Sequence, residues 1–181
     1  MERHTASTVR DEDESLILDV TPCADGEAAE HPAADGDLAG LWICPRCGAR
    51  LATRNLWHSC GKFALEDLFA KSSPAALELA RRYVDLLHTL GDVQVIPQKT
   101  RLVCVARVRF AGFSPRRDGF LASFALQRWL DSPRIVKTAD YGPRWRAHYV
   151  LVRNDTDIDD EFRAWLPESH DVVGMQSNPG R

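Results

Sequence analysis

Three cysteines and one histidine lie close together in the chain with the spacing C-x2-C-x10-H-x-C. They are Cys44, Cys47, His58 and Cys60, and the first pair forms the sequence CPRCG. Such a pair makes a tight turn that brings two thiolates to one point, and Gly48 can adopt the left-handed conformation that this turn needs. If the segment around the second pair is extended, both of its side chains point to one face. Three thiolates and one imidazole form a tetrahedral donor set suited to zinc.

This spacing predicts a zinc knuckle over residues 40–63, and we expect its metal to be structural. Four protein ligands fill a tetrahedral shell, and no Asp or Glu lies between Ala39 and Glu66 to serve as a catalytic base. Another soft metal is one alternative. A thiol–disulfide pair at CPRC is a second, but it requires a helix that begins at the first cysteine within a thioredoxin-like fold.

The net charge of −3 averages two segments of opposite sign. Residues 1–40 hold eleven acidic and two basic residues, a net charge of −9, and the rest of the chain carries +6. Residues 1–39 bury too little apolar surface to offset the entropy cost of ordering them, so we predict a disordered acidic tail. It is either a solubilising extension or a pseudo-ligand that folds back on the basic remainder.

Neither a secretory signal nor a membrane span is expected. The first thirty residues lack an apolar core region, and the chain has no run of about 18 apolar residues. We therefore expect a cytoplasmic protein with no membrane partner. Thiols stay reduced in that compartment, where clustered cysteines bind metals more often than they form disulfides.

Residues 64–174 are expected to form one domain, followed by a frayed C-terminus over residues 175–181. Ser73, Pro74 and Gly91 are the start and stop signals of a helix. Apolar residues then alternate with a period of two, which predicts five strands at 92–97, 101–110, 120–126, 133–139 and 144–153. We expect residues 111–119 to form a loop, because they contain two glycines and a proline.

A helix is predicted over residues 155–166, and Pro167 is expected to end it. Its apolar stripe consists of Ile158, Phe162, Trp165 and Leu166. Strands grouped between helices, rather than alternating with them, predict an α+β fold. We expect a mostly antiparallel sheet of about five strands with helices packed on it, an N-terminal zinc knuckle and a C-terminal helix.

Three segments of the chain resemble a known family. They are WICPRCGARLATRNLWHSCGKFALEDLF, VIPQKTRLVCVARVRFAGFSPRR and HYVLVRNDTDIDDEFRAWL, and the similarity extends over about Trp42 to Gly174. The chain resembles the bacterial domain-of-unknown-function family numbered 5655. This resemblance implies a small α+β domain with an N-terminal zinc knuckle. It implies no activity and no catalytic residue.

Basic residues are concentrated between Lys99 and Arg153, where twelve bases and three acids give a net charge of +9. If the strands are neighbours, arginines and a histidine line one face of the sheet. The candidates for an anion-binding face are Lys99, Arg101, Arg107, Arg109, Arg144, Arg146 and His148. Such a field favours an anionic partner, either nucleic acid or a small phosphorylated or carboxylated ligand. The alternative is a set of solvated side chains without a ligand.

Two other classes of function remain open. Lys99, Tyr141 and His148 are the acid–base groups that a small enzyme or ligand sensor would use, provided that one pocket holds all three. The chain has no paired carboxylates and no nucleophile elbow, so a binding module is favoured over an enzyme. The third class is a protein-interaction adaptor that uses the acidic tail.

Overall fold

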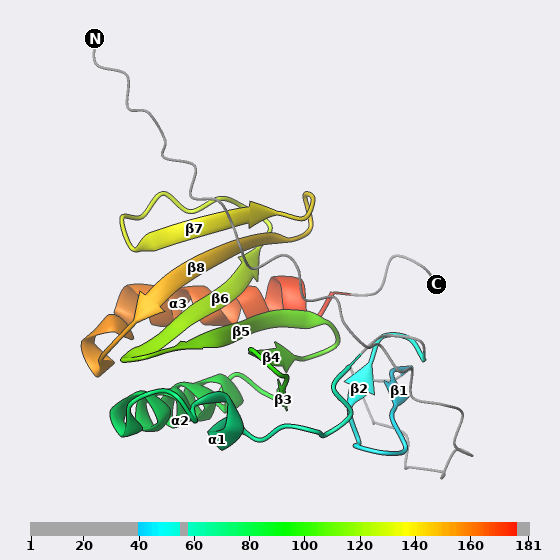
Figure 1. The fold of residues 1–181 in the computed structure, drawn as a ribbon. Helices are drawn as coiled ribbons and strands as arrows, with labels where there is room; N and C mark the ends of the chain where they lie inside the picture. The colour runs from blue at the N-terminus through cyan, green and yellow to red at the C-terminus, as the bar shows by residue number, and fades with distance from the viewer. Residues whose placement is uncertain (1–39, 55–57, 177–181) are drawn as a thin grey trace.

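The computed structural model describes residues 40–54 and 58–176, so the predicted acidic tail (1–39) and residues 177–181 lie outside the described residues. The described chain consists of a two-stranded hairpin, a six-stranded antiparallel sheet and three α-helices (Figure 1). The strand order in the large sheet is β3-β4-β5-β6-β8-β7. The predicted α+β class is therefore confirmed, and the sheet has one strand more than expected.

The elements have the following bounds. The hairpin consists of β1 (Trp42–Ile43) and β2 (Arg50–Leu51). The strands of the large sheet are β3 (Gln94–Pro97), β4 (Leu102–Val105), β5 (Arg109–Arg116), β6 (Gly119–Leu126), β7 (Ile135–Asp140) and β8 (Arg146–Val152). The helices are α1 (Leu65–Leu68), α2 (Pro74–His88) and α3 (Asp160–Glu168). A 3-10 turn, η2 (Asp155–Asp157), precedes α3, and a π-helical segment, η3 (Ser169–Gly174), follows it.

Helix α2 begins where the sequence predicts. Ser73 Oγ accepts a hydrogen bond from the N–H of Ala76 at 3.2 Å, and Pro74 occupies the first helical position. The helix ends at His88, and Gly91 follows three residues later with a φ of +140°. Its buried face consists of Ala76, Leu79, Ala80, Tyr83 and Leu87.

The predicted strand over 101–110 and the predicted loop over 111–119 are both wrong. Strand β4 ends at Val105, a turn follows, and β5 extends from Arg109 to Arg116. The turn is fixed from a distance, because the N–H groups of Arg107 and Val108 both donate to the carbonyl of Gly174 at 2.9 Å. Because Gly174 is so distant in the sequence, the alternation of apolar residues around Arg107 does not indicate this turn.

Strand β5 contains Pro115, one of the residues on which the prediction of a loop was based. The pairing of β4 with β5 reaches only as far as Leu102 opposite Phe113. Pro115 lies beyond that point and pairs with Phe120 of β6 on its other side. The missing N–H of Pro115 therefore removes no hydrogen bond to β4, which is why this strand tolerates it.

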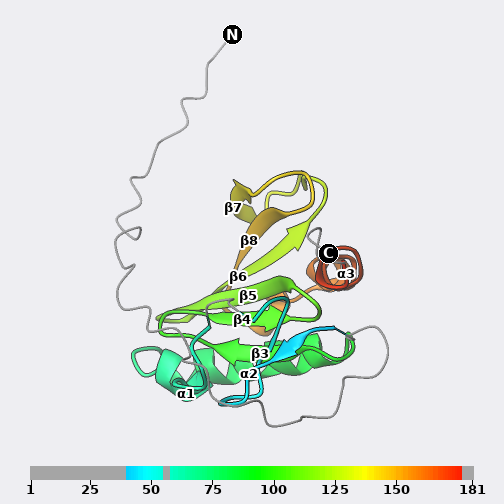
Figure 2. The same ribbon diagram turned by 90° about the vertical axis from the view of Figure 1, so that its right-hand side faces the viewer.

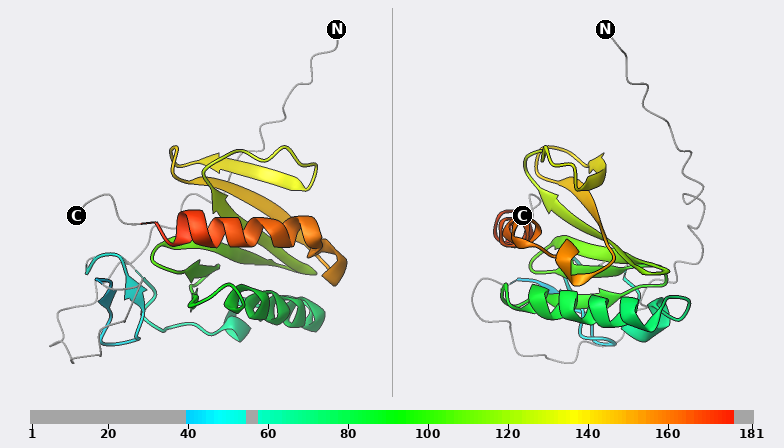
Figure 3. Two further views of the ribbon diagram at one scale, coloured as in Figure 1. Left: turned by 180° about the vertical axis from the view of Figure 1, so that it is seen from behind. Right: turned by 90° about the vertical axis from the view of Figure 1, so that its left-hand side faces the viewer.

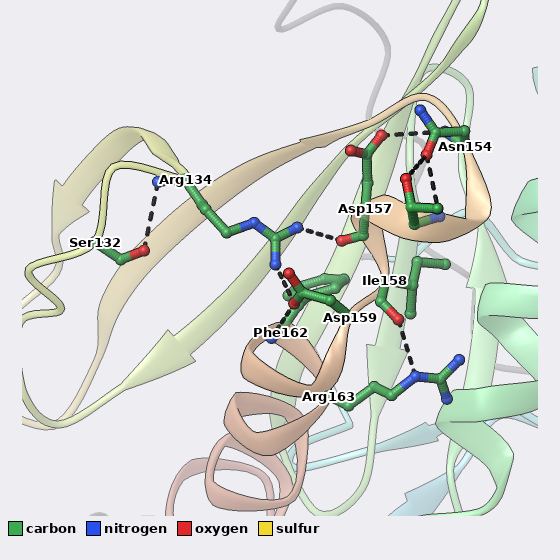
Figure 4. A network of polar contacts seen from close by, with 9 residues as sticks. Ser132, Arg134, Asn154, Asp157, Ile158, Asp159, Phe162 and Arg163 are labelled. Carbon is green, nitrogen blue, oxygen red and sulfur yellow. Dashed lines mark hydrogen bonds and ion pairs between the residues drawn. The ribbon is translucent and has the colours of Figure 1, made fainter.

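The C-terminal helix does not end at Pro167 as predicted. Pro167 lies within α3, and the backbone continues into η3. The hydroxyl of Ser169 donates to the Phe110 carbonyl at 3.0 Å and accepts from the Ala125 N–H at 3.2 Å. These buried contacts with β5 and β6 hold the segment after the proline. Figure 4 shows the start of α3, where Asp159 caps the helix through the Phe162 N–H.

The two faces of the large sheet have different coverings. The inner face packs against α2 and α3 around Tyr83, whose ring is stacked on Phe162 at 5.8 Å between centroids. The predicted stripe of α3 is buried in this core, as is Cys104. Among the described helices, none lies over the outer face of β5, β6 and β8, which faces the viewer in Figure 1, and Figure 3 shows α3 on the opposite side.

Candidate metal centre and the basic sheet face

The first ligand pair lies in the turn of the β1–β2 hairpin. The Cys44 N–H donates to the Ala49 carbonyl at 2.9 Å, and the Gly48 N–H donates to the Cys44 carbonyl at 2.8 Å. Gly48 has a φ of +72°, the left-handed conformation that the sequence predicts. This turn places Cys44 and Cys47 side by side.

The second pair lies in a turn rather than in the extended segment considered above. Cys60 has a φ of +48° and Gly61 a φ of +67°, and the Lys62 N–H donates to the Ser59 carbonyl at 3.3 Å. A Cβ atom at position 61 would lie 3.2 Å from the Cβ of Cys47. The glycine therefore permits both the turn and the close approach of the two ligand segments.

The four predicted ligands converge. One donor atom from each of Cys44, Cys47, His58 and Cys60 lies within 4.8 Å of the others, so the group can hold a metal ion. The Sγ atoms of Cys44 and Cys60 are 3.9 Å apart. Two thiolates on a tetrahedral zinc ion, each at about 2.3 Å from it, lie about 3.8 Å apart, so the spacing fits such an ion.

The electrostatics of the turn favour a thiolate. Burial alone would raise the pKa of Cys44, but hydrogen bonds from the backbone of Arg46 and Cys47 and from the His58 side chain bring it down to about 6. Burial raises the pKa of Cys47, and the neighbouring Cys44 adds to this effect. Since metals bind the thiolate, the backbone donors prepare one ligand of the group.

The knuckle is attached to the edge of the large sheet (Figure 2). Gln94 in β3 accepts from the Arg50 N–H at 2.7 Å through Oε1 and donates to the Gly48 carbonyl at 3.0 Å through Nε2. The apolar residues of this contact are Cys44, Ala49 and Leu51 from the knuckle and Ile96, Val103 and Val105 from the sheet. The knuckle thus forms a layer that covers the outer face of β3 and β4.

The fold around Cys44 differs from the one that a thioredoxin-like redox pair requires. The group offers four donor side chains, the number that a closed tetrahedral shell requires. No helix of the described residues begins at Cys44, so the arrangement required for a thioredoxin-like redox pair is absent there. Cys104 lies apart in the core, where burial raises its pKa to about 12.

The residues predicted for an anion-binding face are spread over several locations. Lys99 and Arg101 are exposed in the β3–β4 turn, Arg107 lies in the β4–β5 turn, and Arg144 precedes β8. Arg109 is on the outer face of the sheet, opposite Val105. Arg146 and His148 are on the inner face, where they pair with Leu126 and Phe124. The expectation that these arginines and the histidine line one face is therefore wrong.

The enzyme hypothesis required Lys99, Tyr141 and His148 to share a pocket, and the structure separates them. Lys99 follows the edge strand β3, whereas Tyr141 follows the opposite edge strand β7. His148 is fully buried, and its Nε2 accepts a hydrogen bond from the Leu130 N–H at 3.2 Å. Burial lowers the pKa of His148, which is the behaviour of a neutral core histidine.

Sequence reasoning missed three residues that define these sites. Gln94 and Asp92 attach the knuckle, and nothing in their local sequence indicates this, because both partners lie over forty residues earlier. Tyr149 is on the outer face with Trp145, a placement that the alternation within β8 could have revealed.

A family model described as "Domain of unknown function (DUF5655)" matches residues 65–173, which is more than half of the chain. The chain belongs to this family. The match begins after the knuckle, so the candidate metal-binding group of this DUF5655 chain lies outside the matched residues. No curated protein and no solved structure matches the chain. Within the described residues, the DUF5655 chain has no helix of the length and apolar character needed to cross a bilayer.

Proposed function

We propose that this DUF5655 chain is a zinc-stabilised binding module for an anionic ligand. A structural zinc ion in the knuckle fixes one edge of the sheet, and the outer face of the sheet holds the anion through Arg109. A cytoplasmic location suits this role, because the thiolate ligands stay reduced there.

One observation carries the anion-binding part. Arg109 is half-buried, and no carboxylate of the described residues pairs with it. Burial lowers its pKa, and the charge of nearby Arg101 lowers it further. Two other arginines whose side chains have little exposure do have an acidic partner, Arg50 with Asp92 and Arg134 with Asp159. A desolvated cation without a counter-charge is costly, and a bound anion removes this cost.

The zinc part rests on the donor set and its geometry. Three sulfur atoms and one imidazole nitrogen lie within 4.8 Å of one another, a combination that zinc prefers to harder cations. When bound, the ion would join the two turns of the knuckle and thereby hold the layer that packs on β3 and β4. Structural zinc contributes directly to folding free energy, so its loss should lower stability.

Elemental analysis of the full chain, purified without chelator, tests the zinc part. We expect one zinc per chain, and Cys44→Ser or Cys60→Ser should lose the metal and melt at a lower temperature. Cys104→Ala is the matched control, because it removes a buried thiol from the core and should lower stability without loss of zinc. If the knuckle variants melt like the wild type with no change in metal content, the zinc proposal is wrong.

Calorimetric titration with inorganic pyrophosphate tests the anion part. We expect binding that weakens as salt rises and that Arg109→Gln abolishes. Arg116→Gln is the control, because Arg116 is exposed at the other end of the same strand. Absence of binding, or an equal loss in both variants, would contradict the proposal.

A further inference from the structure

The outer face of the sheet has a floor of small residues beside Arg109. Ala125 in β6 pairs with Ala147 in β8, and Ala147 pairs with Ala139 in β7. Consecutive residues of a strand point to opposite faces, so these alanines share the face opposite to Phe124 and His148. Ala125 and Ala147 are themselves buried, so larger neighbouring side chains cover them, and Ala139 is partly exposed.

A β-bulge directs Arg109 to this face. Val105 pairs with Arg109 and Cys104 pairs with Ala111, so Phe110 is an extra residue in β5. Phe110 is held on the inner side, where its ring meets His170 edge-on at 5.3 Å between centroids. Arg109 is thereby turned outward, with its guanidinium carbon 5.8 Å from the centre of the Trp145 ring.

Aromatic rings and a second cation surround the floor. Trp145 lies on β8's outer side, and Tyr141 lies against it at 5.4 Å between ring centroids. Tyr141 is 63% exposed, so its ring is open to solvent. The Nζ atom of Lys137 lies 5.6 Å from the centre of the Tyr149 ring. Burial raises the pKa of Tyr149 and so does Tyr141, while Lys137 and Arg109 act in the opposite direction.

These features define two binding elements in contact with each other. The first is the guanidinium of Arg109, whose fork of donors matches the oxygen atoms of a phosphate group. The second is the exposed ring of Tyr141 beside Trp145, a planar surface on which a nucleobase can stack.

We propose that this surface binds a nucleoside phosphate, with the phosphate on Arg109 and the base on the Tyr141–Trp145 pair. The inference rests on the proposed function, because it requires that Arg109 holds the anion. It adds the aromatic half of the site, which a bare phosphate or carboxylate would not use.

Calorimetric titration of the full, zinc-loaded chain separates the two halves. The three probes are adenosine 5′-monophosphate, ribose 5-phosphate, which lacks the base, and adenosine, which lacks the phosphate. We expect the nucleotide to bind at least about tenfold more tightly than either part, since one stacked base contributes roughly that factor or more. Arg109→Gln should abolish binding of the nucleotide and of ribose 5-phosphate, and Arg116→Gln should change neither.

Tyr141→Ala tests the stacking surface at an exposed position, where the substitution should not affect folding. It should weaken the nucleotide about tenfold and leave ribose 5-phosphate unchanged, while Tyr141→Phe keeps the affinity. If ribose 5-phosphate binds as tightly as the nucleotide and needs Arg109, the anion-binding function stands and the nucleotide inference fails. If no phosphate compound binds, both fail. Arg109-dependent binding of a single-stranded oligonucleotide, without binding of the mononucleotide, would also overturn the inference.

Discussion

The guanidinium of Arg50 and the carboxylate of Asp92 form a two-pronged ion pair between the knuckle and the segment before β3. Arg50 Nη2 lies 2.7 Å from Asp92 Oδ1, and Nη1 contacts Oδ2. The Arg50 side chain is only 15% exposed, whereas that of Asp92 is 64% exposed. The ion pair therefore lies at the solvent-exposed border of the contact between the knuckle and β3. Gln94 makes its two hydrogen bonds to the knuckle within this contact.

Asp92→Asn should lower the free energy of unfolding at neutral pH by about 0.5–1 kcal/mol, the upper range for pairs that solvent reaches. Hydrogen bonding to Arg50 holds the pKa of Asp92 below its usual value. The stabilisation is therefore present above the unfolded pKa of about 4, and it disappears as pH falls through the lower folded pKa. Urea unfolding of both proteins across this range measures the difference.

A double-mutant cycle with Arg50→Gln isolates the contribution of the pair itself. The two substitutions together should cost less than the sum of their separate effects. Asp131→Asn, at an exposed position in the β6–β7 connection, is the control for the loss of one negative charge. A difference between wild type and Asp92→Asn that persists unchanged to low pH would contradict the assignment.

Tyr83 offers a substitution that should not destabilise the protein. Its hydroxyl is buried without a hydrogen-bond partner among the described residues, and its ring touches Phe113, Phe120 and Phe162. Tyr83→Phe removes an unsatisfied polar atom and keeps the ring, so we expect the free energy of unfolding to stay equal or to rise by about 1 kcal/mol.

Tyr83→Ala provides the comparison, because it removes the ring as well and should cost about 3–5 kcal/mol. Thermal and urea unfolding measure both variants. A loss of more than about 1 kcal/mol in Tyr83→Phe would show that the hydroxyl is satisfied in solution.

Local patterns predicted most of the elements and the four side chains that converge in the knuckle. Ser73 and Pro74 mark the start of α2, and the period of two places β3, β6, β7 and β8 correctly to within a few residues. The convergence of these four side chains was predictable from their spacing, and CPRCG specifies a tight turn with little dependence on the rest of the fold. Cys60 nevertheless reaches its position through a left-handed backbone conformation rather than through extension.

The errors have one common cause, which is dependence on remote contacts. The β4–β5 turn needs the Gly174 carbonyl, and the continuation of the chain past Pro167 needs the Ser169 contacts with Phe110 and Ala125. The prediction that the basic residues line one face of the sheet was wrong for a related reason. The turn at 106–108 and the bulge at Phe110 break the alternation that placed Arg107 with Arg109. A single-residue shift moves a side chain to the other face of a sheet.

His148 should make the stability of the protein depend on pH in the weakly acidic range. It packs between Phe124 and Trp129, and burial lowers its pKa, as does the charge of Arg128, while Glu168 and the Arg146 backbone act against this. The unfolded chain takes up a proton near pH 6.5, whereas the folded protein resists protonation until a lower pH. The stabilisation is therefore complete above about pH 6.5 and decreases as pH falls toward the folded pKa.

His148→Gln tests this dependence, because glutamine does not titrate and keeps an acceptor for the Leu130 N–H. The slope of unfolding free energy against pH between about 5 and 7 should become flatter than in the wild type. His88→Gln, at the exposed end of α2, is the control for the loss of a histidine outside the core. An unchanged slope in His148→Gln would show that His148 accepts a proton equally well in the folded and unfolded states.

Asp159 combines two roles at the start of α3, and two substitutions separate them. Its Oδ1 accepts from the Phe162 N–H at 2.9 Å and also contacts the guanidinium of Arg134, which reaches α3 from the β6–β7 connection (Figure 4). Asp159→Ala removes the cap and the ion pair and should cost about 1–2 kcal/mol. Asp159→Asn keeps a capping oxygen and should cost less, because only the charge is lost. Urea unfolding at neutral pH ranks the variants, and equal losses would mean that the cap contributes nothing beyond the contact with Arg134.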